Sequence, residues 1–88
     1  MAKRITASNF GINVVFEIRK NLCFIKVNNP MMRGLFKRML SDKGQSQPSE
    51  QGAWDIYEIN GTEEQIAEEL KKSLKTGGLN IVSEEDVE

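Results

Sequence analysis

Residues 29–40 read NPMMRGLFKRML, and this stretch decides how the rest of the chain folds. Asn29 can cap a helix with its side-chain oxygen, and Pro30 has the fixed backbone angle favoured at a first helical position. Five apolar residues then recur at the spacing of one helix face: Met32, Leu35, Phe36, Met39 and Leu40. The stretch therefore predicts an amphipathic helix, and three cations give it a basic outer surface: Arg33, Lys37 and Arg38.

The segment before this helix has the pattern of a β-hairpin over residues 12–27. Its first arm alternates polar residues with four apolar ones: Ile12, Val14, Phe16 and Ile18. A polar turn at residues 19–21 follows, and the second arm, residues 22–27, is apolar on both faces except for Lys26, which suits an inner strand. We expect the apolar helix face to bury against the first arm.

After the helix, residues 41–52 are rich in Gly, Ser, Gln and Pro and predict a long flexible loop. Residues 53–59, AWDIYEI, have the aromatic and β-branched composition of a strand. Thr62 and Gln65 form a capping box for a second helix, which the Gly77-Gly78 pair would end. A short strand at residues 79–82 and an acidic tail at 83–88, expected to fray, complete the chain.

These elements predict a single α+β domain over residues 1–82 with the order β-β-α-β-α-β. Both helices have one apolar face, so we expect them to pack on one face of a mixed sheet of about four strands. The helix between residues 53–59 and 79–82 would join these strands as parallel neighbours through a right-handed crossover. Whether residues 1–11 add a further strand is left open by their short periodicity.

The charge is divided unevenly between the two halves of the 88-residue chain, although its net value is −1. Residues 1–43 hold nine Lys and Arg against two acids, a net charge of +7, and residues 44–88 hold three Lys against eleven acids, a net charge of −8. This division indicates an acidic partner such as phosphate for the first half, or two halves that attract one another in the fold, or simply charged faces that are solvated.

The sequence offers little for catalysis. Histidine is absent, which removes the commonest general base and the commonest metal ligand. The single cysteine, Cys23, lies in an apolar run and predicts a buried, unreactive thiol and a reducing cytoplasm. No glycine-rich phosphate loop and no membrane-spanning run is present. We therefore expect a non-enzymatic cytoplasmic protein with no catalytic residue, no metal site, no cofactor and no membrane partner.

Binding is the remaining function, and both halves supply candidates. Five cations of the first half are expected to form one basic, phosphate-binding surface: Lys20, Lys26, Arg33, Lys37 and Arg38. Phe16 and Phe24 on paired strands would either stack on bases or lie in the core. The second helix carries four acids that can imitate a phosphate backbone and occupy the DNA-binding channel of a nuclease: Glu63, Glu64, Glu68 and Glu69.

Two short segments also carry a resemblance to a known family. ITASNF at residues 5–10, followed by Pro30 and then RGLFK at residues 33–37, resembles a small phage anti-CRISPR protein that acts on type II-C Cas9. That family reads ITSSNF and then a proline, two residues and GLFK. This chain has Ala7 in place of a serine, and three residues separate Pro30 from GLFK. The similarity covers the first 40 residues, and no contact residue is carried over from the family.

The resemblance implies a phage-encoded inhibitor that binds a host macromolecule, most specifically a CRISPR effector nuclease. Two alternatives stay open from the residues: a small nucleic-acid-binding protein that uses the basic half, and a homodimeric structural or assembly protein that pairs through an exposed strand edge. The target and the oligomeric state are not decided by the sequence.

Overall fold

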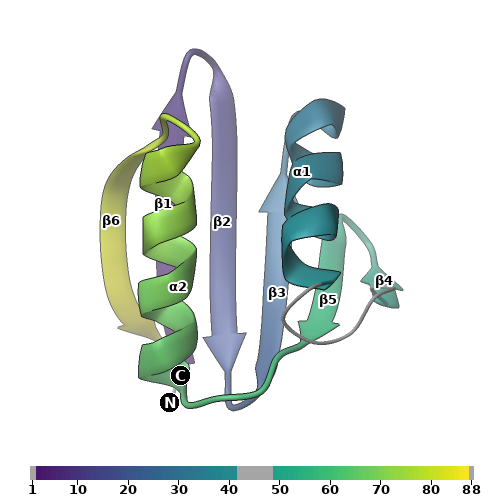
Figure 1. The fold of residues 1–88 in the computed structure, drawn as a ribbon, viewed down its shortest axis with the longest axis vertical. Coiled ribbons are helices and arrows are strands. Elements are labelled where there is room, and N and C mark those ends of the chain that lie inside the picture. Colours follow the sequence, from purple (N-terminus) through teal and green to yellow (C-terminus); the bar gives the residue numbers. More distant parts are fainter. Residues whose placement is uncertain (1, 42–48, 88) are drawn as a thin grey trace.

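A computed structural model describes residues 2–41 and 49–87, and it confirms the α+β class. The described strands form one antiparallel sheet in the order β4-β5-β3-β2-β1-β6, and both helices lie on the same face of it (Figure 1). Along the chain the elements are β1 (Ala2–Asn9), β2 (Ile12–Arg19), β3 (Leu22–Val27), α1 (Pro30–Ser41), β4 (Ser49–Gln51), β5 (Trp54–Glu58), α2 (Glu63–Thr76) and β6 (Asn80–Val87).

The local signals that were expected to start and stop the helices are present. The side-chain oxygen of Asn29 accepts a hydrogen bond from the backbone N–H of Met32 at 3.1 Å and caps α1. Thr62 and Gln65 bond reciprocally at the start of α2, which confirms the capping box. At its end Gly78 has a φ of +82° and the N–H of Leu79 bonds back into the last turn of the helix, so the chain reverses there.

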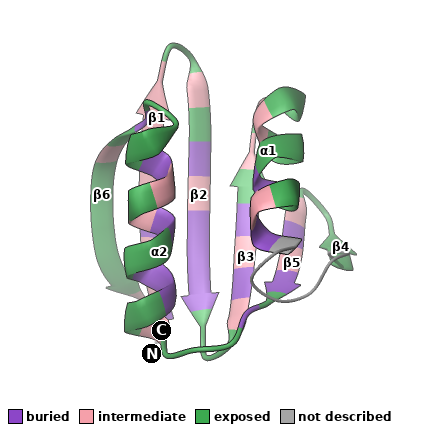
Figure 2. Cartoon of the chain, viewed as in Figure 1, coloured by how far each residue is buried: buried purple, intermediate pink, exposed green. Residues whose placement is uncertain are grey.

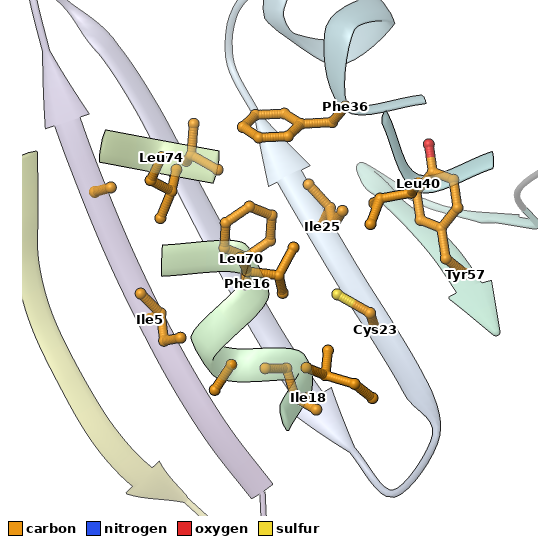
Figure 3. Packing of buried hydrophobic residues seen from close by; sticks show 14 of the residues in the cluster. Ile5, Phe16, Ile18, Cys23, Ile25, Phe36, Leu40, Tyr57, Leu70 and Leu74 are labelled. Carbon is orange, nitrogen blue, oxygen red and sulfur yellow. The ribbon is translucent and has the colours of Figure 1, made fainter. Parts of the chain in front are cut away.

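The core lies between the helices and the covered face of the sheet (Figures 2 and 3). At its centre the rings of Phe16 on β2 and Phe36 on α1 meet edge to face, with their centroids 5.3 Å apart. From α2, Leu70 and Leu74 are both buried in the same cluster, beside Ile5 of β1. One continuous apolar layer therefore joins both helices to the middle of the sheet.

The predicted strand number and order are wrong. The sheet has six described strands rather than about four, because residues 2–9 and 49–51 each add one. The expected parallel pairing between the strands flanking α2 does not occur, since β5 and β6 lie on opposite sides of the sheet and β6 pairs antiparallel with β1. Ile5 and Ala7 are both buried in the core, so β1 is an integral strand of the sheet. The chain that leaves α2 therefore pairs with β1, as β6, and not with β5.

The acidic C-terminal segment is also different from the expected frayed tail. Through Val87 it belongs to β6, whose register with β1 runs from Asn80 to Val87. Glu84 on this strand bonds Lys71 of α2 at 2.9 Å, and Asp86 lies 3.5 Å from Lys3 of β1. Of the predicted loop at 41–52, residues 42–48 lie outside the described residues, and Ser49–Gln51 form the short edge strand β4.

The predicted buried face of α1 is partly correct. Phe36 is 2% exposed and Leu40 is fully buried, while Met32 and Met39 pack against the core from its margin. Leu35, which was expected to be buried, is 39% exposed. The helix lies over β3, one strand further from β1 than expected, so Leu35 faces the space between the two helices rather than the sheet.

Truncating Phe36 tests the core. We expect Phe36→Ala to lower the free energy of unfolding by about 3–5 kcal/mol, because the ring is buried and contacts Phe16. Leu35→Ala is the matched control on the same helix, and we expect it to cost under about 1 kcal/mol since its side chain is largely solvated. Urea denaturation measures both, and a Phe36→Ala variant with an unchanged midpoint contradicts the assigned helix face.

Candidate binding surfaces

The five predicted cations do not form one basic surface. Arg33, Lys37 and Arg38 project from α1, on the helix-covered side of the sheet. Lys26 of β3 lies on the opposite side, because its neighbour Ile25 points into the core and successive strand residues alternate between faces. Lys20 is in the turn between β2 and β3, where it has a positive φ of 55°. The surface expected from sequence is therefore split by the sheet itself.

Arg33 is held within the fold by two carboxylates of the second half of the chain. Its Nε and Nη2 donate to the two oxygens of Asp55 at 2.6 Å each, and Nη2 also reaches Glu50 at 3.1 Å. Asp55 is 4% exposed, so the guanidinium compensates a buried charge and ties α1 to β5. The same hydrogen bonds raise the pKa of Arg33 above its usual range.

Attraction between the two halves of the chain thus accounts for part of the charge division. Arg33 and Lys3 from the basic half pair with acids of the other half. The exposed Lys37 lies beside Arg33 at a shallow hollow on α1, while Arg38 is exposed in the last turn of that helix. Whether these cations also meet a partner stays a prediction.

The four predicted acids lie on α2, the first two in its first turn and the other two one turn later. Glu68 bonds Lys71 at 2.9 Å, and this bond lowers the pKa of its carboxyl. Lys71 also bonds Glu84, so the outer side of α2 is continuous with the acids of β6. Glu69 borders the space between the two helices. The sheet edge at β6 thus carries an acidic surface, defined as Glu63, Glu64, Glu68, Glu84 and Asp86.

Sequence reasoning missed Phe10, the most exposed large apolar side chain among the described residues. It is 94% exposed and occupies the two-residue turn between β1 and β2, where its φ is +50° and that of Gly11 is +79°. Both central residues of such a turn need a positive φ, which Asn and Gly adopt readily and a bulky aromatic residue does not. The unusual Asn-Phe-Gly sequence was the available signal.

Two asparagines fasten this turn to its neighbours. The side-chain amide of Asn9 donates to the carbonyl of Gly78, beyond α2, at 2.6 Å. On the other side the amide of Asn28, before α1, donates to the carbonyl of Gly11 at 3.0 Å. The start of α1 therefore lies at the same end of the molecule, and Met31 in its first turn is 84% exposed (Figure 1). We call Phe10 and Met31 the loop-end residues.

The face of the sheet opposite the helices carries apolar side chains too. Phe24 and Trp54, on the adjacent strands β3 and β5, meet edge to face with centroids 6.4 Å apart. The Nζ of Lys26 lies 5.2 Å from the centroid of the Trp54 ring, a cation–π contact. Phe16, the other phenylalanine proposed for base stacking, is in the core on the helix side.

The described residues hold no group of three or more Cys, Asp or Glu placed to bind a metal ion. Cys23 is buried, and its burial raises the pKa of the thiol to about 12, so the thiolate is scarce at neutral pH. Neither described helix is both long and apolar enough to span a membrane. Comparisons of the chain with protein-family models, with curated proteins and with solved structures found no match.

Removing the guanidinium of Arg33 tests whether its first role is structural. We expect Arg33→Ala to lower the free energy of unfolding by about 3 kcal/mol, near the lower end for a broken buried ion pair because the arginine itself is half exposed. Lys37→Ala, one helical turn away, is the matched control and should cost under about 0.5 kcal/mol. Equal denaturation midpoints for the two variants contradict this role.

Proposed function

We propose that this chain is a non-enzymatic, phage-encoded inhibitor that binds a macromolecule in the host cytoplasm, most specifically a Cas nuclease. The observation that carries the proposal is where the residues shared with the anti-CRISPR family lie. In the GLFK motif Phe36 alone is buried, while Gly34, Leu35 and Lys37 are exposed. Packing in the core accounts for the presence of Phe36 in the motif. Contact with a partner would account for the presence of the three exposed residues.

Gly34 supports this reading because the fold itself does not require a glycine there. Apart from its chain neighbours and the nearby backbone of α1, a Cβ at this position would meet no described atom within 4 Å. Glycine inside a helix nevertheless costs about 1 kcal/mol relative to alanine. A partner backbone or side chain that approaches α1 closely at Gly34 would account for the glycine.

Phe10 supports it independently, from the end of the ITASNF segment. A non-glycine residue in the left-handed region costs about 1–2 kcal/mol, and an exposed ring gains no burial in return. The asparagine bonds on both sides hold the turn in place, so Phe10 projects from a fixed position. An aromatic side chain fixed in this way is suited to enter an apolar pocket of a protein partner.

The acidic surface supplies a second means of inhibition on the same target. Its carboxylates can compete for the lysines and arginines with which a Cas nuclease holds nucleic acid. On α1, two exposed cations, Lys37 and Arg38, offer the opposite arrangement, in which the helix docks on guide RNA or on an acidic protein surface. Ion pairs within the fold involve both sets of charges, since Arg33 is bonded to Asp55, Glu68 and Glu84 share Lys71, and Asp86 lies 3.5 Å from Lys3.

Replacing Phe10 separates binding from stability. Phe10→Asn creates an Asn-Gly turn, so we expect the free energy of unfolding to rise by about 1 kcal/mol. Inhibition of DNA cleavage by a guide-loaded type II-C Cas9 should nevertheless fall, because the projecting ring is lost. A stabilised variant that inhibits as well as the parent shows that Phe10 makes no contact with the nuclease. A parent protein that neither inhibits the nuclease nor co-elutes with it contradicts the proposed function.

Charge reversal distinguishes the two mechanisms in the same cleavage assay. Changing Glu63, Glu64, Glu68 and Glu69 to lysine should abolish inhibition if the acids compete with nucleic acid. Changing Lys37 and Arg38 to glutamate should abolish it if α1 docks through its cations. Circular dichroism must show an intact fold in each variant, because positive charge in the first turn of α2 opposes the helix dipole. Inhibition that survives both reversals excludes both mechanisms.

A further inference from the structure

The sheet face that points away from the helices carries an apolar patch that the function above does not use. Five side chains on β2, β3 and β5 are only half-buried there, and no described element lies over them (Figures 1 and 2). Together with the exposed Lys26 they form what we call the aromatic face: Val15, Leu22, Phe24, Trp54 and Ile56. A sheet face open to solvent is normally lined by polar residues, so this composition indicates a ligand.

The patch is too small to hold another folded copy of the chain. Three strands about 4.8 Å apart and five residues along β3 enclose on the order of 200 Å², whereas a stable interface buries about 800 Å² on each partner. Beyond β2 the same face becomes polar, with Arg4, Thr6 and Ser8 on β1. Its size suits two or three flat groups instead.

The charged residues on this side of the sheet are of both signs, and the cation that lies against a ring is Lys26, which favours an anionic group at that point. Lys26 is exposed beside Trp54, and the guanidinium of Arg4 lies 3.6 Å from Glu17, a loose ion pair that is longer than a hydrogen bond. Glu17 itself is nearly buried and is bonded by Arg19 at 2.7 Å. Two further carboxylates lie on this side of the sheet: Glu58 of β5 pairs with Leu22, and Glu85 of β6 pairs with Arg4. The acids of α2 are behind the sheet.

We propose that the aromatic face binds single-stranded nucleic acid. Unpaired bases stack on Trp54 and Phe24, while Lys26 moves from the indole ring to a phosphate. Aromatic rings on adjacent strands of an open sheet, with cations at the margin, are the arrangement that unstacked bases require. A duplex hides the faces of its bases, so it is not a ligand. This site is separate from the loop-end residues and does not depend on the proposed function.

Trp54 is the single tryptophan of the chain and reports directly on the site. We expect a ten-nucleotide oligo-dT to quench its fluorescence at about 50 mM salt, with an affinity that falls with salt at a log–log slope of about −0.7 for each phosphate contact. A duplex of equal length should cause no quenching. Phe24→Leu, which keeps an apolar side chain but removes the ring, and Lys26→Ala should each weaken binding about tenfold. Lys37→Ala, which removes the same charge on the helix side, should not.

Several results overturn the proposal. One is a fluorescence spectrum that oligo-dT leaves unchanged, and another is equal quenching by the duplex. Equal weakening by Lys26→Ala and Lys37→Ala shows attraction to net charge rather than a site. If emission instead changes with protein concentration alone, and sedimentation shows a dimer, the face is covered by a second copy. Because none of these measurements involves a nuclease, their failure is distinct from failure of the proposed function.

Discussion

The contact between Phe16 and Phe36 is the interaction on which the arrangement of this protein depends. It joins α1 to β2 across β3, at the centre of a sheet with both helices on one face. With so few residues, one buried layer must supply the apolar area that offsets the loss of conformational entropy. The other side of the sheet is consequently not covered by either helix, and Phe24 and Trp54 are only half-buried there.

Features encoded within a few residues could be predicted from the sequence. Asn29, Thr62 and Gln65 cap their helices because a cap depends only on the next three positions. The hairpin between β2 and β3 also followed from local alternation. Strand order could not be predicted in the same way, because the pairing of β6 with β1 joins residues at the two ends of the chain, and no local pattern states which edge a strand will meet.

The candidate surfaces show a similar limit. The sequence predicted that Lys26 and Arg33 belong to one basic surface. Strand alternation points Lys26 away from α1, but this could be recognised only once the structure showed which face of the sheet α1 covers. Asp55 reads in sequence as one polar residue in a strand, yet it is the buried partner of Arg33. A charge total for each half of the chain counts both residues and cannot tell a paired guanidinium from an exposed ammonium.

Two positions break the usual local rules, and both belong to the two segments on which the proposed function rests. Phe10 occupies a left-handed turn that favours asparagine, and Gly34 weakens a helix without a packing reason. Residues that lower stability and make no compensating contact are retained where binding requires them, since substitutions to Asn or Ala would otherwise be favourable. The asparagine bonds that fix the turn beside α1 place Phe10 near the start of the helix that carries Gly34. Gly34, however, lines the hollow beside Glu50 and Asp55 of β4 and β5, whereas Phe10 is in the turn between β1 and β2. Each of the two unfavourable residues therefore needs its own explanation, and the variants that replace them have to be tested separately.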